Sequence, residues 1–270
     1  MPKLMSLITA KPEFTREGLI ERYEHGHAIL ALKLVPFFSD YRRSFVVPGS
    51  VRQSAVGAPL VDFHVYNQMS FADAGKLERL GAALSGDVAD AITMDESAFM
   101  VRERIFIVDV EEFVSPEQDL AVPPPRVRMP VVKMVTLTRR PPAMSRRQFR
   151  DAYEGDYVRA FIRNFGSRIA EFVRSYPSED SPLRLPHLGE PHRELDFDVL
   201  EETWFWTREA YHQHQAAVSA QALPASGSPS LQDAGPTTSF LVDEHRTSAE
   251  TLDVASRIHD LKPRLNQRSQ

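Results

Sequence analysis

His27 stands in the apolar stripe of a predicted helix. Leu19, Tyr23, His27, Leu30 and Leu34 recur at spacings of three and four residues, which places them on one helix face. An imidazole held among apolar side chains can act as a general base near neutral pH. The same position also suits a core histidine that is hydrogen-bonded to the backbone. Both interpretations remain open at the level of sequence.

Three polar residues alternate along a predicted strand at 60–68. Asp62, His64 and Tyr66 share one face, with Phe63 and Val65 on the other. We expect this polar face to line the space between sheet and helices and to meet His27, where a carboxylate or phenol would orient the imidazole or transfer a second proton. The alternatives are an exposed sheet edge and a structural network.

Other residues are candidates for substrate binding. The hydroxyls of Tyr23 and Tyr157 sit at inward helix positions, and Asp198 with Tyr157 could form a second, altered pocket. Trp204 could be a pocket wall or part of the core. Core packing is the competing role for the two tyrosines.

Several kinds of chemistry are excluded or unsupported. The chain has no cysteine, which excludes disulfides and thiolate chemistry. The pairs His25/His27 and His212/His214 fall on predicted helices, where residues two apart diverge rather than converge on a metal. Phosphate-binding glycine loops and serine nucleophile elbows are absent from the sequence. We therefore expect no metal site and no cofactor.

The composition is that of a soluble globular protein. The 270 residues are 42% hydrophobic and 26% charged, with a net charge of -5, which argues against nucleic acid as a partner. No apolar run is long enough for a membrane span or a signal peptide, so we expect no membrane association and a cytoplasmic location.

The sequence contains an internal repeat. Three pairs of segments correspond in the same order: 15–27 with 145–157, 62–65 with 196–199, and 106–109 with 240–243. A period of 130 residues is too long for a solenoid, so each half should be a separate folding unit.

Each half is predicted to have the order β-α-β-β-α-β of a ferredoxin-like unit, in the α+β class. The expected strands are 3–9, 40–47, 60–68 and 104–111, then 131–138, 169–176, 197–203 and 238–243. The expected helices are 15–34, 71–84 and 86–95, then 145–165 and 207–220, with Thr15 and Ser145 as N-caps. An antiparallel sheet with helices on one face needs a partner for its other face. We therefore predict that the two sheets pack into a pseudo-dimeric α/β barrel.

The expected organisation has four parts. They are a first unit at 1–114, a Pro-rich linker at 115–129, a diverged second unit at 130–245 and a polar tail at 246–270. Two insertions in the second unit, 177–194 and 223–236, are predicted to be loops.

The opening of the chain resembles that of EthD-like proteins of the dimeric α/β-barrel superfamily. The resemblance rests on Lys3–Thr9, on the segment Pro12–Ala28 that contains His27, and on Asp95–Phe99. It implies a ferredoxin-like barrel, in a superfamily with polyketide cyclases, dehydratases or lyases, cofactor-free monooxygenases and some haem proteins. Asp156–Tyr157 replace Gly26–His27 in the second half, so a functional helix histidine would belong to the first half alone.

These observations favour a cofactor-independent lyase, dehydratase or cyclase that acts by acid–base chemistry on a hydrophobic oxygenated aromatic or polyketide-like molecule. The alternatives are a cofactor-free or haem-dependent oxidoreductase on the same barrel, and a non-catalytic protein that binds a small molecule. Because the barrel would close within one chain, we expect a monomer, although a homodimer through surface helices is compatible with the sequence.

Overall fold

In the computed structural model, the described residues are 2–53, 61–125, 129–178, 197–220 and 237–248. Nearly all of the predicted insertions at 177–194 and 223–236, and of the tail at 246–270, lie outside these ranges. Within them, no helix has both the length and the apolar character that a membrane span requires.

The two halves repeat one order of elements. The first contains β1 (Lys3–Ile8), α1 (Arg16–Arg22), α2 (Ala28–Leu34), β2 (Phe38–Val46), β3 (Arg52–Gln53), β4 (Val65–Phe71), α3 (Ala74–Ala83), α4 (Gly86–Phe99) and β5 (Phe106–Val114). The second contains β6 (Val132–Thr138), α5 (Arg146–Ala152), α6 (Val158–Phe165), β7 (Glu171–Pro177), β8 (Val199–Phe205), α7 (Arg208–Ala220) and β9 (Thr237–Ser248). Short 3₁₀ turns lie at Arg102–Arg104, Glu117–Asp119 and Gly166–Arg168.

Eight strands close into a barrel in the order β2-β4-β1-β5-β7-β8-β6-β9, and β9 pairs back onto β2. All of these pairs are antiparallel, and the halves meet at two seams. At one seam β5 pairs with β7, with Val110 opposite Pro177; at the other β2 pairs with β9, with Phe45 opposite Asp243. Closure leaves neither sheet with a long unpaired edge, which confirms the predicted pseudo-dimeric barrel.

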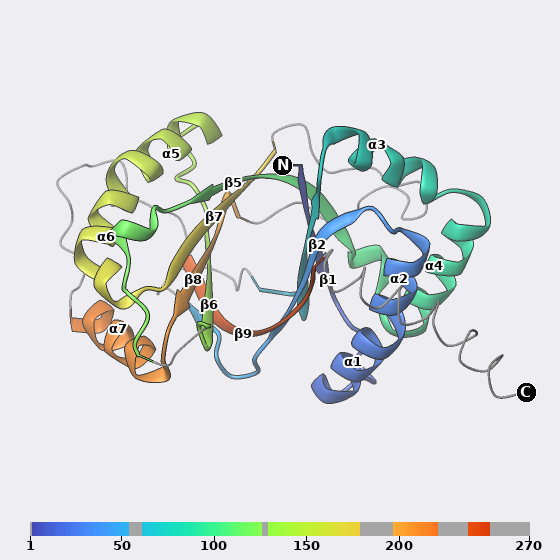
Figure 1. Cartoon of the computed structure of the whole chain (residues 1–270), viewed down its shortest axis with the longest axis horizontal. Helices are drawn as coiled ribbons and strands as arrows, with labels where there is room; N and C mark the ends of the chain where they lie inside the picture. The colour runs from blue at the N-terminus through green and yellow to red at the C-terminus, as the bar shows by residue number, and fades with distance from the viewer. Residues whose placement is uncertain (1, 54–60, 126–128, 179–196, 221–236, 249–270) are drawn as a thin grey trace, which may run out of the picture.

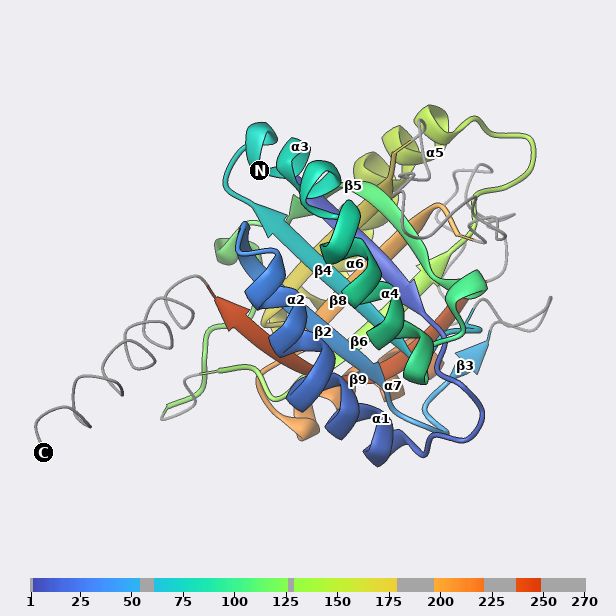
Figure 2. The same cartoon turned by 90° about the vertical axis from the view of Figure 1, so that its right-hand side faces the viewer.

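The helices form two layers on opposite sides of the barrel. Helices α1–α4 of the first half cover one side and α5–α7 of the second half cover the other (Figures 1 and 2). The buried hydrophobic residues accordingly fall into three clusters, one under each helical layer and one inside the barrel. The strands under the helical layers are therefore mostly buried on both sides, whereas β5 and β9, at the seams, carry exposed side chains such as Glu111 and Asp243.

A π-helical turn interrupts the first helix of each half at the same place. Tyr23–His27 joins α1 to α2, and Tyr153–Tyr157 joins α5 to α6. The extra residue in this turn shifts the inward helix face from the predicted one. The residues after His27 that line the cavity are Ala31 and Val35, whereas Leu34 packs at the edge of the buried cluster. The N-caps are as predicted: the side chains of Thr15 and Ser145 accept backbone hydrogen bonds.

Several boundaries differ from those expected, and β9 continues to Ser248, past the predicted strand end at 243 and into the predicted tail. The strand predicted at 60–68 begins at Val65 and runs on to Phe71, and the helix predicted at 86–95 continues to Phe99. The two-residue strand β3 was not predicted. The β4 shift has the largest consequence, because it leaves Asp62 and His64 before the strand.

Candidate functional site

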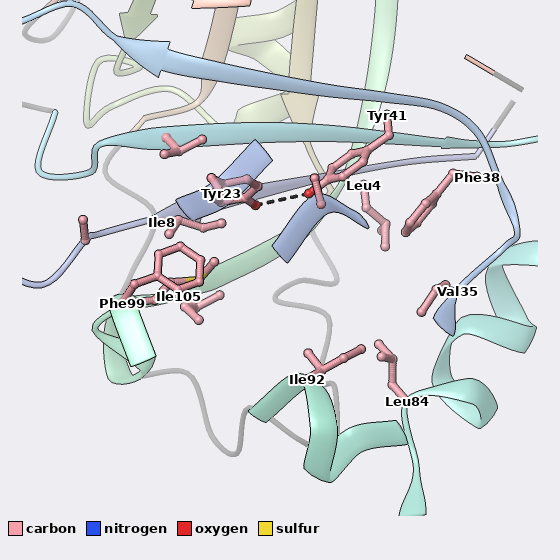
Figure 3. Packing of buried hydrophobic residues seen from close by; sticks show 14 of the residues in the cluster. Leu4, Ile8, Tyr23, Val35, Phe38, Tyr41, Leu84, Ile92, Phe99 and Ile105 are labelled. Atoms are coloured by element: carbon pink, nitrogen blue, oxygen red, sulfur yellow. Dashed lines mark hydrogen bonds between the residues drawn. The ribbon is translucent and has the colours of Figure 1, made fainter. Parts of the chain in front are cut away.

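A small cavity lies between the first-half helices and the sheet, with a volume of about 70 Å³. Its walls are mainly apolar: Figure 3 shows Leu84 and Ile92 across from Leu4, Val35 and Phe38. The polar side chains in its lining are Ser6, Tyr23, His27, Tyr41, Asn67 and Glu96. An apolar space with a few polar groups is typical of a small-molecule site.

His27 lies in this lining and is held by a carboxylate from α4. Its Nδ1 is 2.7 Å from Oδ2 of Asp95, and Arg22 forms an ion pair with the other oxygen of Asp95. His27 is 7% exposed. A carboxylate at Nδ1 favours the tautomer with hydrogen on Nδ1, which leaves the Nε2 lone pair to accept a proton.

Local helix geometry assembles this group. Arg22 precedes the π-helical turn, His27 ends it, and Gly26 lies between them. A Cβ at position 26 would collide with the guanidinium of Arg22, so glycine leaves the space through which Arg22 reaches Asp95. Tyr23 packs edge-on against His27, with ring centroids 4.8 Å apart, and limits how far the imidazole can tilt.

A second polar group in the lining is a row of three side chains. The amide Nδ2 of Asn67 is 2.8 Å from the hydroxyl of Tyr23, which is 3.1 Å from the hydroxyl of Tyr41. Figure 3 shows the Tyr23–Tyr41 contact beside the cavity wall. All three residues are at most 2% exposed. The row therefore extends from β4 through the π-helical turn to β2.

The charge states follow from burial and partners. Burial alone would raise the pKa of Asp95, but the hydrogen bonds from His27 and Arg22 outweigh it and hold that pKa below its usual value. Burial raises the pKa of Tyr41 to about 12 and the pKa of Tyr23 well above its usual value. At neutral pH the site thus holds an ionised carboxylate behind His27 and two protonated phenols.

The structure does not bring Asp62, His64 and Tyr66 to His27. Asp62 is exposed and paired with Arg104. His64 accepts a hydrogen bond from the backbone of Ala10 through Nδ1, and burial together with the Arg104 charge lowers its pKa. Neither residue lines the cavity.

Tyr66 lies on the opposite face of β4, inside the barrel. Its hydroxyl donates to Glu202 at 2.8 Å, and its ring packs in the barrel cluster. Tyr66 does not meet His27 because side chains alternate between the two faces of β4. Val65 and Asn67 face the helices, and Tyr66, between them, faces the barrel interior.

The remaining predicted residues are dispersed. Tyr23 lines the cavity, whereas Trp204 lies 4.9 Å from the Lys133 ammonium inside the barrel. Asp198 accepts hydrogen bonds from the backbone and side chain of Arg140 and lines a separate cavity under the second half. Tyr157 stacks on Phe161 and does not line the cavity that Asp198 lines, so this cavity does not join the two residues.

The equivalent layer of the second half is filled with aromatic rings. Where the cavity has Ala31 and Val35, the second half has Phe161 and Phe165, whose ring centroids are 5.3 Å apart. Tyr157 stands in place of His27. The repeat is thus symmetric in backbone and asymmetric at the site.

Sequence reasoning missed Asp95, Asn67 and Tyr41 as site residues. Asp95 opens the segment Asp95–Phe99 that resembles EthD-like proteins, so a signal for it was present. Asn67 and Tyr41 carry no such signal, because each needs the strand register to be placed. The sequence also held a signal for the π-helical turn. Residues spaced strictly by four, as at 149, 153, 157, 161 and 165, rotate by about 40° per step around an ideal α-helix, so they stay on one face only if the helix is locally underwound.

The cavity beside His27 does not fit a haem. The described residues contain no cluster of three or more potential metal ligands. His27 could in principle ligate a haem iron, but a cavity of about 70 Å³ is far smaller than a tetrapyrrole. The residues around His27 therefore do not fit a haem.

Comparison with known proteins gives structural matches alone. No protein-family model and no curated protein matches the sequence. A putative monooxygenase from Lactobacillus acidophilus is 8% identical, with 92% of this chain and 96% of that chain covered and a TM-score of 0.48. An anthrone oxidase-like protein is 16% identical, with 92% of both chains covered and a TM-score of 0.46.

A third match is shorter. An EthD family protein from Bacillus halodurans is 20% identical and covers 42% of this chain and 100% of its own, with a TM-score of 0.27.

In this chain, the order of strands and the two seams between the halves define the architecture. It is an α+β protein in which two tandem ferredoxin-like units form a single-chain, pseudo-dimeric α/β barrel.

Proposed function

We propose that this protein is a cofactor-independent enzyme that transfers protons to and from a hydrophobic, oxygenated small molecule, as a lyase, dehydratase or cyclase. The observation that carries the proposal is the His27–Asp95 pair, at 2.7 Å, on the wall of an apolar cavity. His27 would be the general base, and Asp95 and Arg22 would position it.

The reaction would begin at a carbon next to a carbonyl group. His27 Nε2 takes the proton from this carbon, the C–H electron pair forms a carbon–carbon double bond, and the carbonyl π electrons move to oxygen. Asp95 stabilises the imidazolium that results. For dehydration, the electron pair on the enolate oxygen re-forms the carbonyl, the enolate double bond shifts to the next carbon, and the C–O bond there breaks as the imidazolium protonates the departing hydroxide to water. For ring closure, the enolate carbon bonds to a second carbonyl carbon, and the imidazolium protonates the alkoxide that results. The proton that His27 removes from carbon is the proton that it later donates, so the reaction needs no oxidant.

The cavity volume limits what part of the substrate enters. At about 70 Å³ it is roughly half of the ~150 Å³ cavity that accommodates benzene. It therefore accepts the reacting carbonyl and its neighbouring carbons, while the rest of an aromatic or polyketide-like molecule would extend past α3 and α4. A non-catalytic binding protein would use the same walls without proton transfer.

The test is hydrogen–deuterium exchange at carbons next to a carbonyl. Small ketones, beginning with 2-butanone, are incubated with the protein in deuterium oxide and followed by NMR. We expect wild type to accelerate exchange and His27→Gln to reduce that acceleration by roughly 10²- to 10⁴-fold. His25→Gln is the matched control, because His25 lies on the same turn and is exposed.

Either of two results would contradict the proposal. The first is wild-type exchange no faster than buffer while the ketones still bind, which would assign the protein to the binding class. The second is equal exchange by wild type and His27→Gln, which would place the base elsewhere.

A further inference from the structure

The direction of the hydrogen bonds in the Asn67–Tyr23–Tyr41 row determines what the cavity offers to a ligand. The Asn67 amide nitrogen can only donate, and its two hydrogens are directed to Ser6 Oγ at 2.9 Å and to the hydroxyl of Tyr23 at 2.8 Å. Tyr23 accepts from Asn67, so its own proton is free to be donated to Tyr41 at 3.1 Å. Among the described residues, the hydroxyl of Tyr41 contacts no other hydrogen-bond acceptor, so its proton has no partner, and Tyr41 lines the cavity.

The other end of the row presents an acceptor. Oδ1 of Asn67 is buried and has no hydrogen-bond partner among the described residues. A buried amide oxygen without a partner costs roughly 1–3 kcal/mol, so a group that donates to it would be favoured. Asn67 also lines the cavity. The row therefore has one free donor and one free acceptor.

We infer that Tyr41 binds the carbonyl oxygen of the substrate and that Asn67 Oδ1 accepts from a substrate hydroxyl, which identifies the substrate class as hydroxy ketones. This inference rests on the proposed function. In that reaction Tyr41 stabilises the oxygen that gains negative charge when His27 removes the neighbouring proton. The hydroxyl is the group that leaves as water after protonation by His27.

The second half is a natural contrast. Tyr41 corresponds to Phe172, as shown by the equivalent ion pairs that follow them, Arg43 with Glu24 and Arg174 with Glu154. Asn67 corresponds to Glu201 in the repeated strand. At the equivalent positions the second half thus has neither the phenol nor the amide, and Phe161 and Phe165 lie where the first half has the cavity walls Ala31 and Val35.

The test measures binding, so that it does not depend on turnover. The probes are 4-hydroxy-2-butanone and 2-butanone, each labelled with ¹³C at the carbonyl and titrated by NMR. Wild type should bind the hydroxy ketone about fivefold more tightly, the value of one neutral hydrogen bond of ~1 kcal/mol. It should also shift the carbonyl resonance downfield through the hydrogen bond from Tyr41.

Two tyrosine variants form a matched pair, since each loses one hydroxyl from the same row. Tyr41→Phe should weaken both ketones about five- to tenfold and abolish the carbonyl shift. Tyr23→Phe should weaken binding less than Tyr41→Phe and should keep the carbonyl shift, because Tyr41 keeps its proton. Equal effects of the two variants, or a larger effect of Tyr23→Phe, would overturn the direction of the row.

Asn67→Asp reverses the row at nearly constant volume. A carboxylate accepts from Tyr23, so Tyr41 donates to Tyr23 and turns its proton away from the cavity. Both ketones should then bind as weakly as they do to Tyr41→Phe, and the preference for the hydroxy ketone should disappear. Unchanged binding in this variant would contradict the inference. Wild-type ketone binding without deuterium exchange would reject His27 as the base and leave the inference on the row intact.

Discussion

Glu201 and Glu202 are neighbours in β8 whose side chains lie in different layers, and at neutral pH one is protonated and the other ionised. Glu201 faces the helices of the second half, where burial raises its pKa to about 8 against the hydrogen bond from Tyr153. Glu202 faces the barrel interior; burial would raise its pKa, but Lys133 outweighs it and the pKa falls to about 2. A single step along a strand thus separates a neutral acid from a carboxylate.

The Glu201 pKa predicts a loss of stability with rising pH. The unfolded chain ionises near 4.5 and the folded protein near 8, so the contribution of Glu201 is fully present below pH 4.5 and is lost as pH rises to 8. Glu201→Gln should therefore be more stable than wild type at pH 9, by roughly 2–4 kcal/mol, and similar to it at pH 4. Urea unfolding at the two pH values measures this difference.

Glu202 gives the opposite sign. Its folded pKa lies below its unfolded value, so its stabilisation is present above pH 4.5 and is lost as pH falls toward 2. Glu202→Gln should be less stable than wild type at pH 7, because the buried ammonium of Lys133 then loses one of its two carboxylate partners and keeps only Glu244. The deficit should shrink on acidification. A deficit that is constant from pH 7 to pH 3 would contradict the ionised state of Glu202.

Ala31→Phe should close the candidate site by reproducing the second half in the first. The added ring would occupy the cavity as Phe161 fills the equivalent layer, at an overpacking cost of about 1–3 kcal/mol. Binding of 2-butanone and deuterium exchange should both be lost. Ile29→Phe is the control, since Ile29 lies on the same helix and is 57% exposed. Retained binding in the Ala31 variant would place the ligand elsewhere.

Gly26→Ala should weaken the positioning of His27 without touching the cavity. The new methyl group would displace the guanidinium of Arg22 and deprive Asp95 of one of its two partners. We expect the exchange rate to fall about tenfold at unchanged 2-butanone affinity, as when an outer partner of a functional histidine is lost. Gly155→Ala is the matched control in the second π-helical turn, where a Cβ meets open space. Equal activity of the two variants would show that Arg22 is dispensable.

Two ion pairs recur at equivalent places and should matter for stability in both halves. Arg43 binds Glu24 through two nitrogens, and Arg174 binds Glu154 in the same way. Replacing either arginine with methionine should cost roughly 1–3 kcal/mol in urea unfolding, because a half-buried carboxylate loses its guanidinium and keeps only His245 beside Glu24 or the Tyr176 hydroxyl beside Glu154. Arg147→Met, at a side chain that is 85% exposed, should have little effect. A small effect of Arg43→Met would mean that water replaces the guanidinium.

The sequence predicted the repeat, the order of elements and the inward position of His27, because each depends on local spacing. It did not predict the partner of His27, since Asp95 lies 68 residues away on a different helix. The error at Asp62, His64 and Tyr66 has a physical cause. Tyr66 and the adjacent Asn67 are both at most 2% exposed. Because neither face of β4 is exposed to solvent, the pattern of polar and apolar residues does not determine which face meets the helices.

The asymmetry between Ala31 and Phe161 bears on how such a protein can change. In a homodimer one gene encodes both subunits, so a substitution that reshapes one active centre reshapes its twin. Joining two units in one chain removes that constraint while keeping the barrel closed through β2–β9 and β5–β7. One half can keep a fully packed layer that stabilises the barrel, and substitutions in the other half can then change its ligand without altering the packed half.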